Sequence, residues 1–167
     1  MKKIKFTIKK ERLLFLIVFL SLIGLSKFLN LVLVNGNSMY PTYHDKNLLT
    51  SIEIQNHNEE IDINDIVVFT LKDEPDFLYI KRVVGKPNDT LEIKNGTLYR
   101  NDKKVKDDFP KIEEPGILNK KIKLKNNEYF CMGDNRNHST DSREFGPITK
   151  DRITHKIRNK FLGPILN

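Results

Sequence analysis

Apolar residues are unevenly distributed along the chain, and the longest apolar run lies near the N-terminus. Residues 13–26 contain no charged side chain, and the run continues past Lys27 to residue 34. As a helix, 13–34 would extend about 33 Å, enough to cross a bilayer with Lys27 snorkelling to its far side. Lys and Arg dominate the first twelve residues, which favours a cytoplasmic N-terminus. The pattern predicts a basic cytoplasmic tail over 1–12, a transmembrane anchor with its membrane-proximal segment over 13–34, and an extracytoplasmic catalytic β domain over 35–167.

Two other interpretations of this apolar segment stay open. The uncharged part also suits the core of a signal peptide, and residues 24–26 form a small-x-small triplet at which a leader could be cut. The chain contains no alanine and therefore no Ala-x-Ala site, so a retained anchor is the favoured interpretation. A buried core helix fits poorly with the basic flank.

After residue 34 the pattern changes to short alternating or β-branched runs separated by turn residues, which is typical of strands. No strand–helix alternation follows, so the predicted fold class is mainly β: a single N-terminal transmembrane helix followed by an antiparallel β-sheet domain. Asn95-Gly96 suits a type I′ hairpin turn. The predicted strands cover residues 47–52, 66–69, 77–84, 128–132 and 153–161, with a hairpin over 91–100.

One stretch of this domain has no strand pattern. Residues 106–127 are rich in charge and contain Pro110 and Pro115. The composition predicts an exposed, loosely ordered excursion with no sign of a functional site.

The strand over 77–84 contains an unusual lysine. Alternation places Lys81 on the same face as Phe77, Tyr79 and Val83, in an apolar row. Such a lysine can protect an edge strand from aggregation. It can instead be buried with a lowered pKa, which suits a catalytic base. The strand alone does not decide between these interpretations.

Two other stretches concentrate polar chemistry. Ser38 lies in a turn that contains Gly36 and ends at Pro41, which leaves its hydroxyl open to one face. The second stretch, 133–146, is bracketed by glycines and alternates charges of opposite sign with hydroxyls, which indicates an interlocked network that fixes one loop shape. Its polar members are Asp134, Asn135, Arg136, Ser139, Asp141, Ser142 and Arg143.

Charge and composition exclude several classes of protein. The net charge is +7, but the first twelve residues contribute most of it, which leaves the main domain nearly balanced. A nucleic-acid-binding surface would carry its charge on the folded domain, so no nucleic-acid partner is expected. The single cysteine, Cys131, excludes an internal disulfide, and the four histidines lack metal-ligand spacing. We expect neither a metal nor a cofactor.

A serine hydroxyl needs a base before it can act as a nucleophile. His138 is the only histidine near a motif, and nothing in its context indicates an orienting aspartate, so a Ser-His-Asp triad is disfavoured. Lys81 can do the same work if burial keeps its amine neutral.

Four segments in one order support this second option. They read S-M-x-P-T from Ser38, N-D-I-V-V-F over 64–69, Y-I-K-R-V-V-G-x-P-x-D over 79–89, and G-D-N-R-x-x-S-x-D-S-R-x-x-G over 133–146. Behind an N-terminal anchor, this combination resembles the bacterial type I signal peptidases, also called leader peptidases. The lysine and the short chain are similar to the Gram-positive branch.

The resemblance implies a role for each matched residue. Ser38 would be the nucleophile, Lys81 the general base, and Ser139 the hydroxyl that orients Lys81. The salt-bridged support of the loop would come from Asp141, Arg143 and Arg82. The Ser38 backbone N–H would donate to the oxyanion, and Gly36 occupies the position where some members have a serine as second donor. Candidates for the small apolar substrate pockets are Val34, Met39, Tyr79 and Ile80.

The implied function is a membrane-bound serine endopeptidase of the cytoplasmic membrane. It would remove signal peptides from exported preproteins at small-x-small sites by a Ser-Lys dyad, with preproteins and the lipid bilayer as partners. A related self-cleaving repressor would need a soluble DNA-binding domain, and residues 1–34 are too short and apolar for one. A non-catalytic, membrane-tethered export or pilus-assembly factor is the alternative from another class. It predicts that Ser38 and Lys81 are dispensable.

Overall fold

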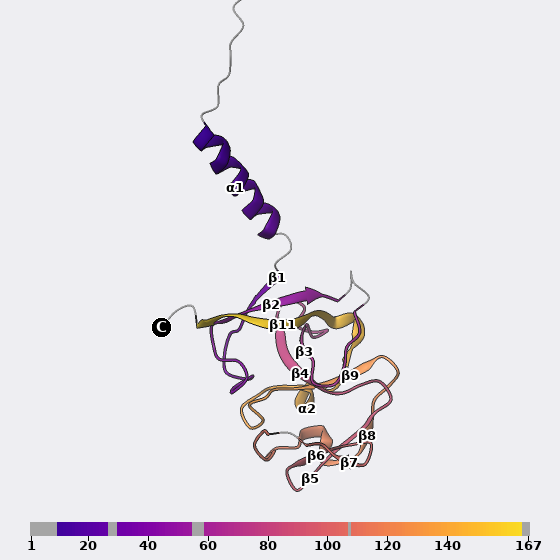
Figure 1. The fold of residues 1–167 in the computed structure, drawn as a ribbon. Helices are drawn as coiled ribbons and strands as arrows, with labels where there is room; N and C mark the ends of the chain where they lie inside the picture. The colour runs from indigo at the N-terminus through magenta and orange to yellow at the C-terminus, as the bar shows by residue number, and fades with distance from the viewer. Residues whose placement is uncertain (1–9, 27–29, 55–58, 107, 165–167) are drawn as a thin grey trace, which may run out of the picture. The chain divides into compact units, whose positions relative to one another are not determined.

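The computed structural model describes residues 10–26, 30–54, 59–106 and 108–164 (Figure 1). The chain divides into two compact units, residues 1–30 and 31–167. The larger unit carries nearly all the strands, in two sheets.

The smaller unit contains the helix α1 (Lys10–Ser26). After Arg12 its sequence is uncharged, as expected for the apolar run. No helix among the described residues is long and apolar enough to span a bilayer. Residues 30–33 form the strand β1 (Asn30–Leu33), within the stretch predicted as anchor and membrane-proximal segment, so the helix does not continue to residue 34. The membrane anchor itself stays a prediction, and residues 27–29 lie outside the described residues.

The first sheet of the larger unit has seven strands in the order β1-β2-β11-β3-β4-β9-β10. Its neighbouring strands from β2 to β10 pair antiparallel, which confirms the predicted mainly antiparallel β architecture. The last strand, β11, lies between β2 and β3 in the middle of the sheet. Besides β1, its members are β2 (Asn47–Glu53), β3 (Ile66–Phe69), β4 (Tyr79–Gly85), β9 (Glu128–Met132), β10 (Ile148–Thr149) and β11 (Ile153–Pro164).

The second sheet has four strands in the order β7-β6-β5-β8. At the turn between β5 and β6, Asn95 and Gly96 have φ values of 50° and 74°. Both are positive, as a type I′ turn requires, so the predicted hairpin is confirmed. The members of this sheet are β5 (Thr90–Lys94), β6 (Thr97–Arg100), β7 (Lys103–Lys104) and β8 (Ile122–Lys123).

The prediction of an exposed excursion over 106–127 is wrong for its apolar residues. Ile112, Leu118 and Leu124 are at most 5% exposed and pack in one hydrophobic cluster with residues of β5 and β6. Leu118 belongs to a short 3₁₀ helix, η1 (Gly116–Asn119), and β8 pairs with β5. The charged residues of this stretch that the structure describes are exposed, but its sparse apolar residues complete the core of the second sheet.

Side-chain alternation in β3 shows how the first sheet is covered. Val67 and Phe69 join one cluster of buried residues, and Ile66 and Val68 join another. Neighbouring residues of a strand point to opposite faces, so both faces of this sheet are packed. A third cluster joins Val84 of β4 to the second sheet. The central strands β3 and β4 are therefore rigidly held, which suits a precisely positioned site.

Candidate active site

Ser38 lies in the turn that connects β1 to β2. The turn is closed by backbone hydrogen bonds from Tyr40 to Asn37 and from Tyr43 to Met39, at 3.1 and 2.9 Å. The Met39 side chain is fully buried in the core cluster around Leu49. Because the residue after Ser38 is anchored in the core, the Ser38 side chain is held at the surface of the sheet.

Lys81 comes from the middle of β4, where it is paired in register with Val67 of β3. The residue is only 4% exposed, so the buried interpretation is the right one and the edge-strand interpretation is wrong. Burial lowers the pKa of Lys81 to about 8, although Asp141 acts in the opposite direction. Its Nζ donates a hydrogen bond of 2.8 Å to Ser38 Oγ. The structure thus brings together two residues that are far apart in the sequence.

Both side chains open into one cavity of about 560 Å³. Most of its other lining residues are apolar, and Phe77 and Leu78 at its rim are 58% and 61% exposed. The Tyr79 ring also lies 5.8 Å from Lys81 Nζ. The cavity is lined by Leu31, Val32, Leu33, Asn35, Ser38, Val68, Phe77, Leu78, Tyr79, Ile80, Lys81, His138, Ser139, Thr140 and His155.

A first ion pair ties the serine turn to β4. Arg82 donates from Nε and Nη2 to the two carboxylate oxygens of Asp134, at 2.7 and 2.6 Å. Asp134 is fully buried, and it also accepts a hydrogen bond from the Thr42 hydroxyl at 2.5 Å. A fork of two charge-assisted bonds fixes orientation as well as distance. Thr42 is four residues after Ser38, so the pair holds the turn in place.

Asn135 makes the most direct contact between the 133–146 loop and the serine. Its backbone N–H donates to the Ser38 carbonyl oxygen at 3.1 Å, and its side chain donates to the Asn37 carbonyl oxygen. The loop therefore fixes the two peptide groups that flank Ser38.

A second ion pair supports the loop from within. Arg143 donates from Nε and Nη2 to the carboxylate of Asp141, at 2.9 and 2.8 Å, and both residues are buried. Asp141 caps the short helix α2 (Ser142–Phe145) by accepting from the Arg143 N–H, and it also accepts from the Gly133 N–H at 3.0 Å. Arg82, which was predicted to support the same loop, forms its ion pair with Asp134 of that loop and not with Asp141.

Ser139 lies in the same cavity as Lys81, but the predicted orienting contact is not made. Among the described residues the buried Ser139 hydroxyl has no hydrogen-bond partner, and the Lys81 ammonium donates its hydrogen bond to Ser38 instead. Ser139 packs directly against Gly133, where an added Cβ would overlap both its side chain and the Ser38 carbonyl oxygen. Only glycine at 133 allows these two serines to approach each other.

Three further predicted residues lie elsewhere than expected. The Gly36 N–H donates to Asp45 Oδ1 at 2.7 Å, so it is engaged and does not serve the oxyanion in this structure. Val34 and Met39 are 2% and 0% exposed within the core, and neither lines the cavity. Tyr79 and Ile80 do line it.

Sequence reasoning assigned no role to several residues that build the site. Thr42 and Asp134 stand in the quoted segments, yet their mutual contact depends on two loops that meet only in the fold. His155, on β11, borders the cavity because β11 is inserted beside β3. The only sequence signal for this position was the length of the strand over 153–164, which is long enough to reach the cavity.

A serine hydroxyl beside a desolvated lysine in an apolar cavity is an arrangement that hydrolases use to activate a nucleophile. The comparisons with known proteins agree with this class. Residues 7–162 match the family described as signal peptidase, peptidase S26. The chain belongs to this family and is therefore a peptidase of the type I signal peptidase class.

Individual relatives extend the comparison. The chain is 39% identical to a signal peptidase I of Bacillus amyloliquefaciens over 138 residues, which covers 72% of this chain and 67% of the relative. It is 31% identical to signal peptidase I U of Bacillus subtilis (strain 168) over 88% of this chain and 87% of the relative. A crystal structure of a signal peptidase I from Enterococcus faecalis V583 is 24% identical, with a TM-score of 0.47 over 57% of this chain and 94% of that one.

Proposed function

We propose that this chain is a membrane-anchored serine endopeptidase that removes signal peptides from exported preproteins with a Ser-Lys dyad. The observation that carries the proposal is the 2.8 Å hydrogen bond between Lys81 Nζ and Ser38 Oγ. Family membership supports the substrate class, since the relatives are named signal peptidases. The burial of Lys81 supports the choice of base.

In the proposed reaction, the neutral amine of Lys81 takes the proton of Ser38 Oγ as that oxygen attacks the carbonyl carbon of the scissile peptide bond. The resulting ammonium then gives its proton to the leaving amine, which departs with the mature protein. An ester between Ser38 and the signal peptide remains. Lys81 next removes a proton from water, the hydroxide attacks the ester, and the proton returns to Ser38 Oγ.

Two features favour a neutral lysine at working pH. Burial lowers the pKa of Lys81 to about 8, so about a tenth of it is uncharged at pH 7, far more than of an ordinary lysine. The nearest buried carboxylates, Asp134 and Asp141, are already bound by Arg82 and Arg143. Each carboxylate therefore directs its hydrogen bonds to an arginine, and Lys81 keeps Ser38 as its partner.

The oxyanion would be stabilised by the Ser38 backbone N–H. No hydrogen bond from this N–H is found within the described part of the chain, so it is available to a substrate oxygen. The contact from Asn135 to the Ser38 carbonyl fixes the peptide plane that follows Ser38, and the bond to Asn37 fixes the plane that carries this N–H.

The proposed cleavage site has small residues on the signal-peptide side of the scissile bond. The cavity beside Ser38 is bordered by Val68, Tyr79 and Ile80, whose side chains favour small apolar partners over charged ones. We also propose that a segment within residues 13–34 anchors the enzyme in the cytoplasmic membrane, with its N-terminus in the cytoplasm and 35–167 outside. The basic residues before Leu13 support that orientation.

The test is cleavage of a purified preprotein, in detergent, by the wild-type chain, Ser38→Ala and Lys81→Ala. We expect both variants to lose activity by at least about 10⁴-fold, because nucleophile and base act as a unit. Lys86→Ala is the matched control: it removes a lysine that directly follows β4 and whose ion pair with Asp62 lies at the surface.

Three outcomes would contradict the proposal. Cleavage by Ser38→Ala at the wild-type rate would assign the chemistry to another residue. Activity of Lys81→Ala with a normal pH profile would remove lysine as the base. Failure of the wild-type chain on several preproteins would favour the non-catalytic, membrane-tethered factor.

A further inference from the structure

The active-site cavity extends across the first sheet to a histidine that the proposed reaction does not use. His155 lines the cavity from β11 and is half-buried. In the register of the sheet, Val68 of β3 lies opposite His155 on one side and opposite Ile80 of β4 on the other. Val68 and Ile80 also line the cavity. Because neighbouring strands lie about 4.8 Å apart, the His155 backbone is about 10 Å from that of Ile80, two strands away from the one that carries Lys81.

A β-bulge turns His155 toward this cavity. Ile153 lies opposite Phe69, and His155 lies opposite the next residue of β3. Thr154 is therefore an extra residue in the ladder. In an unbroken strand Ile153 and His155 would share a face. Ile153 stays in the hydrophobic cluster of Phe69. His155 faces the other way, beside Val68 of the opposite cluster, because the bulge reverses the alternation.

Hydrogen bonds at the bulge determine which nitrogen of the imidazole carries the proton. The Thr154 hydroxyl donates to the Val68 carbonyl oxygen at 3.2 Å, and its oxygen lies 3.0 Å from His155 Nδ1. A hydroxyl has one hydrogen, which the carbonyl already receives, so Nδ1 must donate to Thr154. The neutral ring then has its lone pair on Nε2. Within the described residues Nε2 has no hydrogen-bond partner, so this acceptor is open to a ligand in the cavity.

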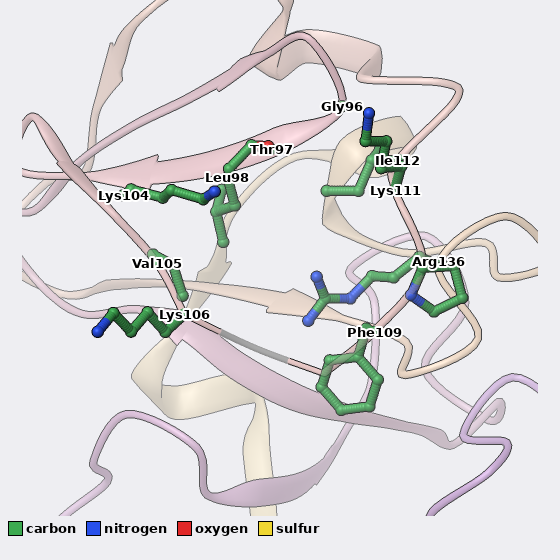
Figure 2. A pocket seen from close by; sticks show the side chains of 11 residues that line it. Gly96, Thr97, Leu98, Lys104, Val105, Lys106, Phe109, Lys111, Ile112 and Arg136 are labelled. Carbon is green, nitrogen blue, oxygen red and sulfur yellow. The ribbon is translucent and has the colours of Figure 1, made fainter.

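His138 is the second histidine of the active-site cavity, and its ring is not held in the same way. It is exposed, and no side chain in the part of the chain that the structure describes hydrogen-bonds its ring. The cavity of about 290 Å³ beside the β5–β6 hairpin shares no lining residue with the active-site cavity (Figure 2), so a ligand there would not line up with His155. His155 is therefore the oriented acceptor beside a bound peptide.

We propose that His155 selects preproteins with a hydroxyl side chain, serine or threonine, at one position before the scissile bond, by accepting its hydrogen bond at Nε2. The inference rests on the proposed function, since the peptide lies in the same cavity. Val68 and Ile80 make the surroundings apolar, so a substrate residue without a hydroxyl would leave the acceptor unpaired. Alternate side chains of an extended peptide face the same way, so we expect the third or fifth residue before the bond to be selected.

The test is cleavage of matched peptides by the full-length chain in detergent micelles. The peptides carry threonine, or its isostere valine, at each of the second to sixth residues before the scissile bond. We expect kcat/KM to favour threonine about five- to tenfold at one position, as one neutral hydrogen bond would. The preference should be lost in His155→Leu and kept in His155→Gln, whose amide oxygen also accepts. The matched control, His138→Leu, should keep it.

Three outcomes overturn the proposal. The first is a threonine-to-valine ratio below about twofold at every position, too small for a hydrogen bond. The second is a preference that survives in His155→Leu. The third is loss of the preference in both His155→Leu and His155→Gln, which would mean that the ring acts by packing.

Peptide binding separates this inference from the proposed function, because it needs no catalysis. The same peptides are titrated by fluorescence anisotropy against Ser38→Ala and Ser38→Ala/His155→Leu. Tighter binding of the threonine peptide by Ser38→Ala alone supports the role of His155 even if the wild type cleaves no peptide. Equal binding of threonine and valine peptides by Ser38→Ala overturns that role and leaves the peptidase proposal intact.

Discussion

The two sheets of the larger unit differ in what they bury. Around the seven-stranded sheet, charged side chains lie in the interior: Lys81, Asp134, Asp141 and Arg143 are at most 5% exposed. The four-stranded sheet buries apolar side chains such as Leu91, Leu98 and Leu118, and none of the buried polar residues that the structure describes lies on β5 to β8. The chain thus separates a polar, functional interior from an apolar, supporting one.

This difference indicates in which region stability and activity are coupled. Buried charges are costly to desolvate, and they persist when partners and geometry compensate for them. In the first sheet the compensation comes from two forked Arg–Asp pairs that also position Ser38 and the 133–146 loop. In the second sheet hydrophobic burial supplies the stability without involving the site. Substitutions in the two regions should therefore have different consequences.

The largest effect is expected from Asp141→Asn, which breaks the polar interior. The substitution leaves the buried Arg143 charge without its carboxylate, which costs about 3–5 kcal/mol of unfolding free energy. It also weakens the cap of α2 and the bond from Gly133, so peptidase activity should fall even in the folded fraction. Urea unfolding and preprotein cleavage measure both effects.

The control for this variant is Asp102→Asn, which breaks an ion pair with Lys121 at the surface of the second sheet. We expect it to change neither property, since exposed pairs contribute little. A stable, active Asp141→Asn enzyme would show that the buried pair is not needed. Stability and activity would then not be coupled in the seven-stranded sheet as we propose.

A slightly smaller effect on stability, with no effect on chemistry, is expected from Leu118→Ala. The side chain is fully buried in the core of the second sheet, and its removal leaves a cavity that costs about 2–5 kcal/mol. The rate per folded molecule should stay near that of the wild type. Asn119→Ala, at the exposed neighbouring position, is the matched control. A large loss of kcat in fully folded Leu118→Ala would mean that the supporting core is coupled to the site.

The smallest expected effect is the dependence of kcat/KM on pH, which follows the protonation of Lys81. Below a pKa of about 8 the base is increasingly protonated, so kcat/KM should rise about tenfold per pH unit and level off above that value. A step near the usual lysine value of 10.5, or a flat profile, would contradict the assignment of Lys81 as the base.

The same proton affects stability with a definite sign. Between pH 8 and 10.5 the unfolded chain holds a proton on this lysine that the folded chain has lost, so stability should rise with pH across that window. Urea midpoints at both ends of the window, compared with those of Lys81→Met, measure the contribution. A fall in stability for the wild type relative to Lys81→Met would show that the folded-state pKa is raised instead.

The parts of the fold that could be predicted are those set by local signals. The Asn95-Gly96 hairpin follows from two adjacent residues that tolerate positive φ, and the strand β9 follows from an apolar run between turn residues. The prediction for residues 106–127 failed because Ile112, Leu118 and Leu124 are too widely spaced to show the periodicity of a strand or a helix. Their burial depends on the distant hairpin that they cover.

The partners within the site could not be predicted for a similar reason. The sequence contains Arg82 and Arg143 together with Asp134 and Asp141, and composition does not assign one to another. The register of β4 on β9 places Arg82 opposite Met132, two residues before Asp134, and this selects the pair. The segments predicted the members of the site, whereas the sheet register determines their contacts.

The position of β11 has a consequence for the order in which the protein is made. Of the described strands β11 is synthesised last, yet it separates β2 from β3 and pairs with both. While the ribosome is still translating the earlier strands, the sheet has an open gap between the strand that follows Ser38 and the strand beside Lys81. A nascent chain should therefore be an inert precursor until that gap is filled, and an enzyme that hydrolyses other polypeptides would acquire its activity only after β11 has been made.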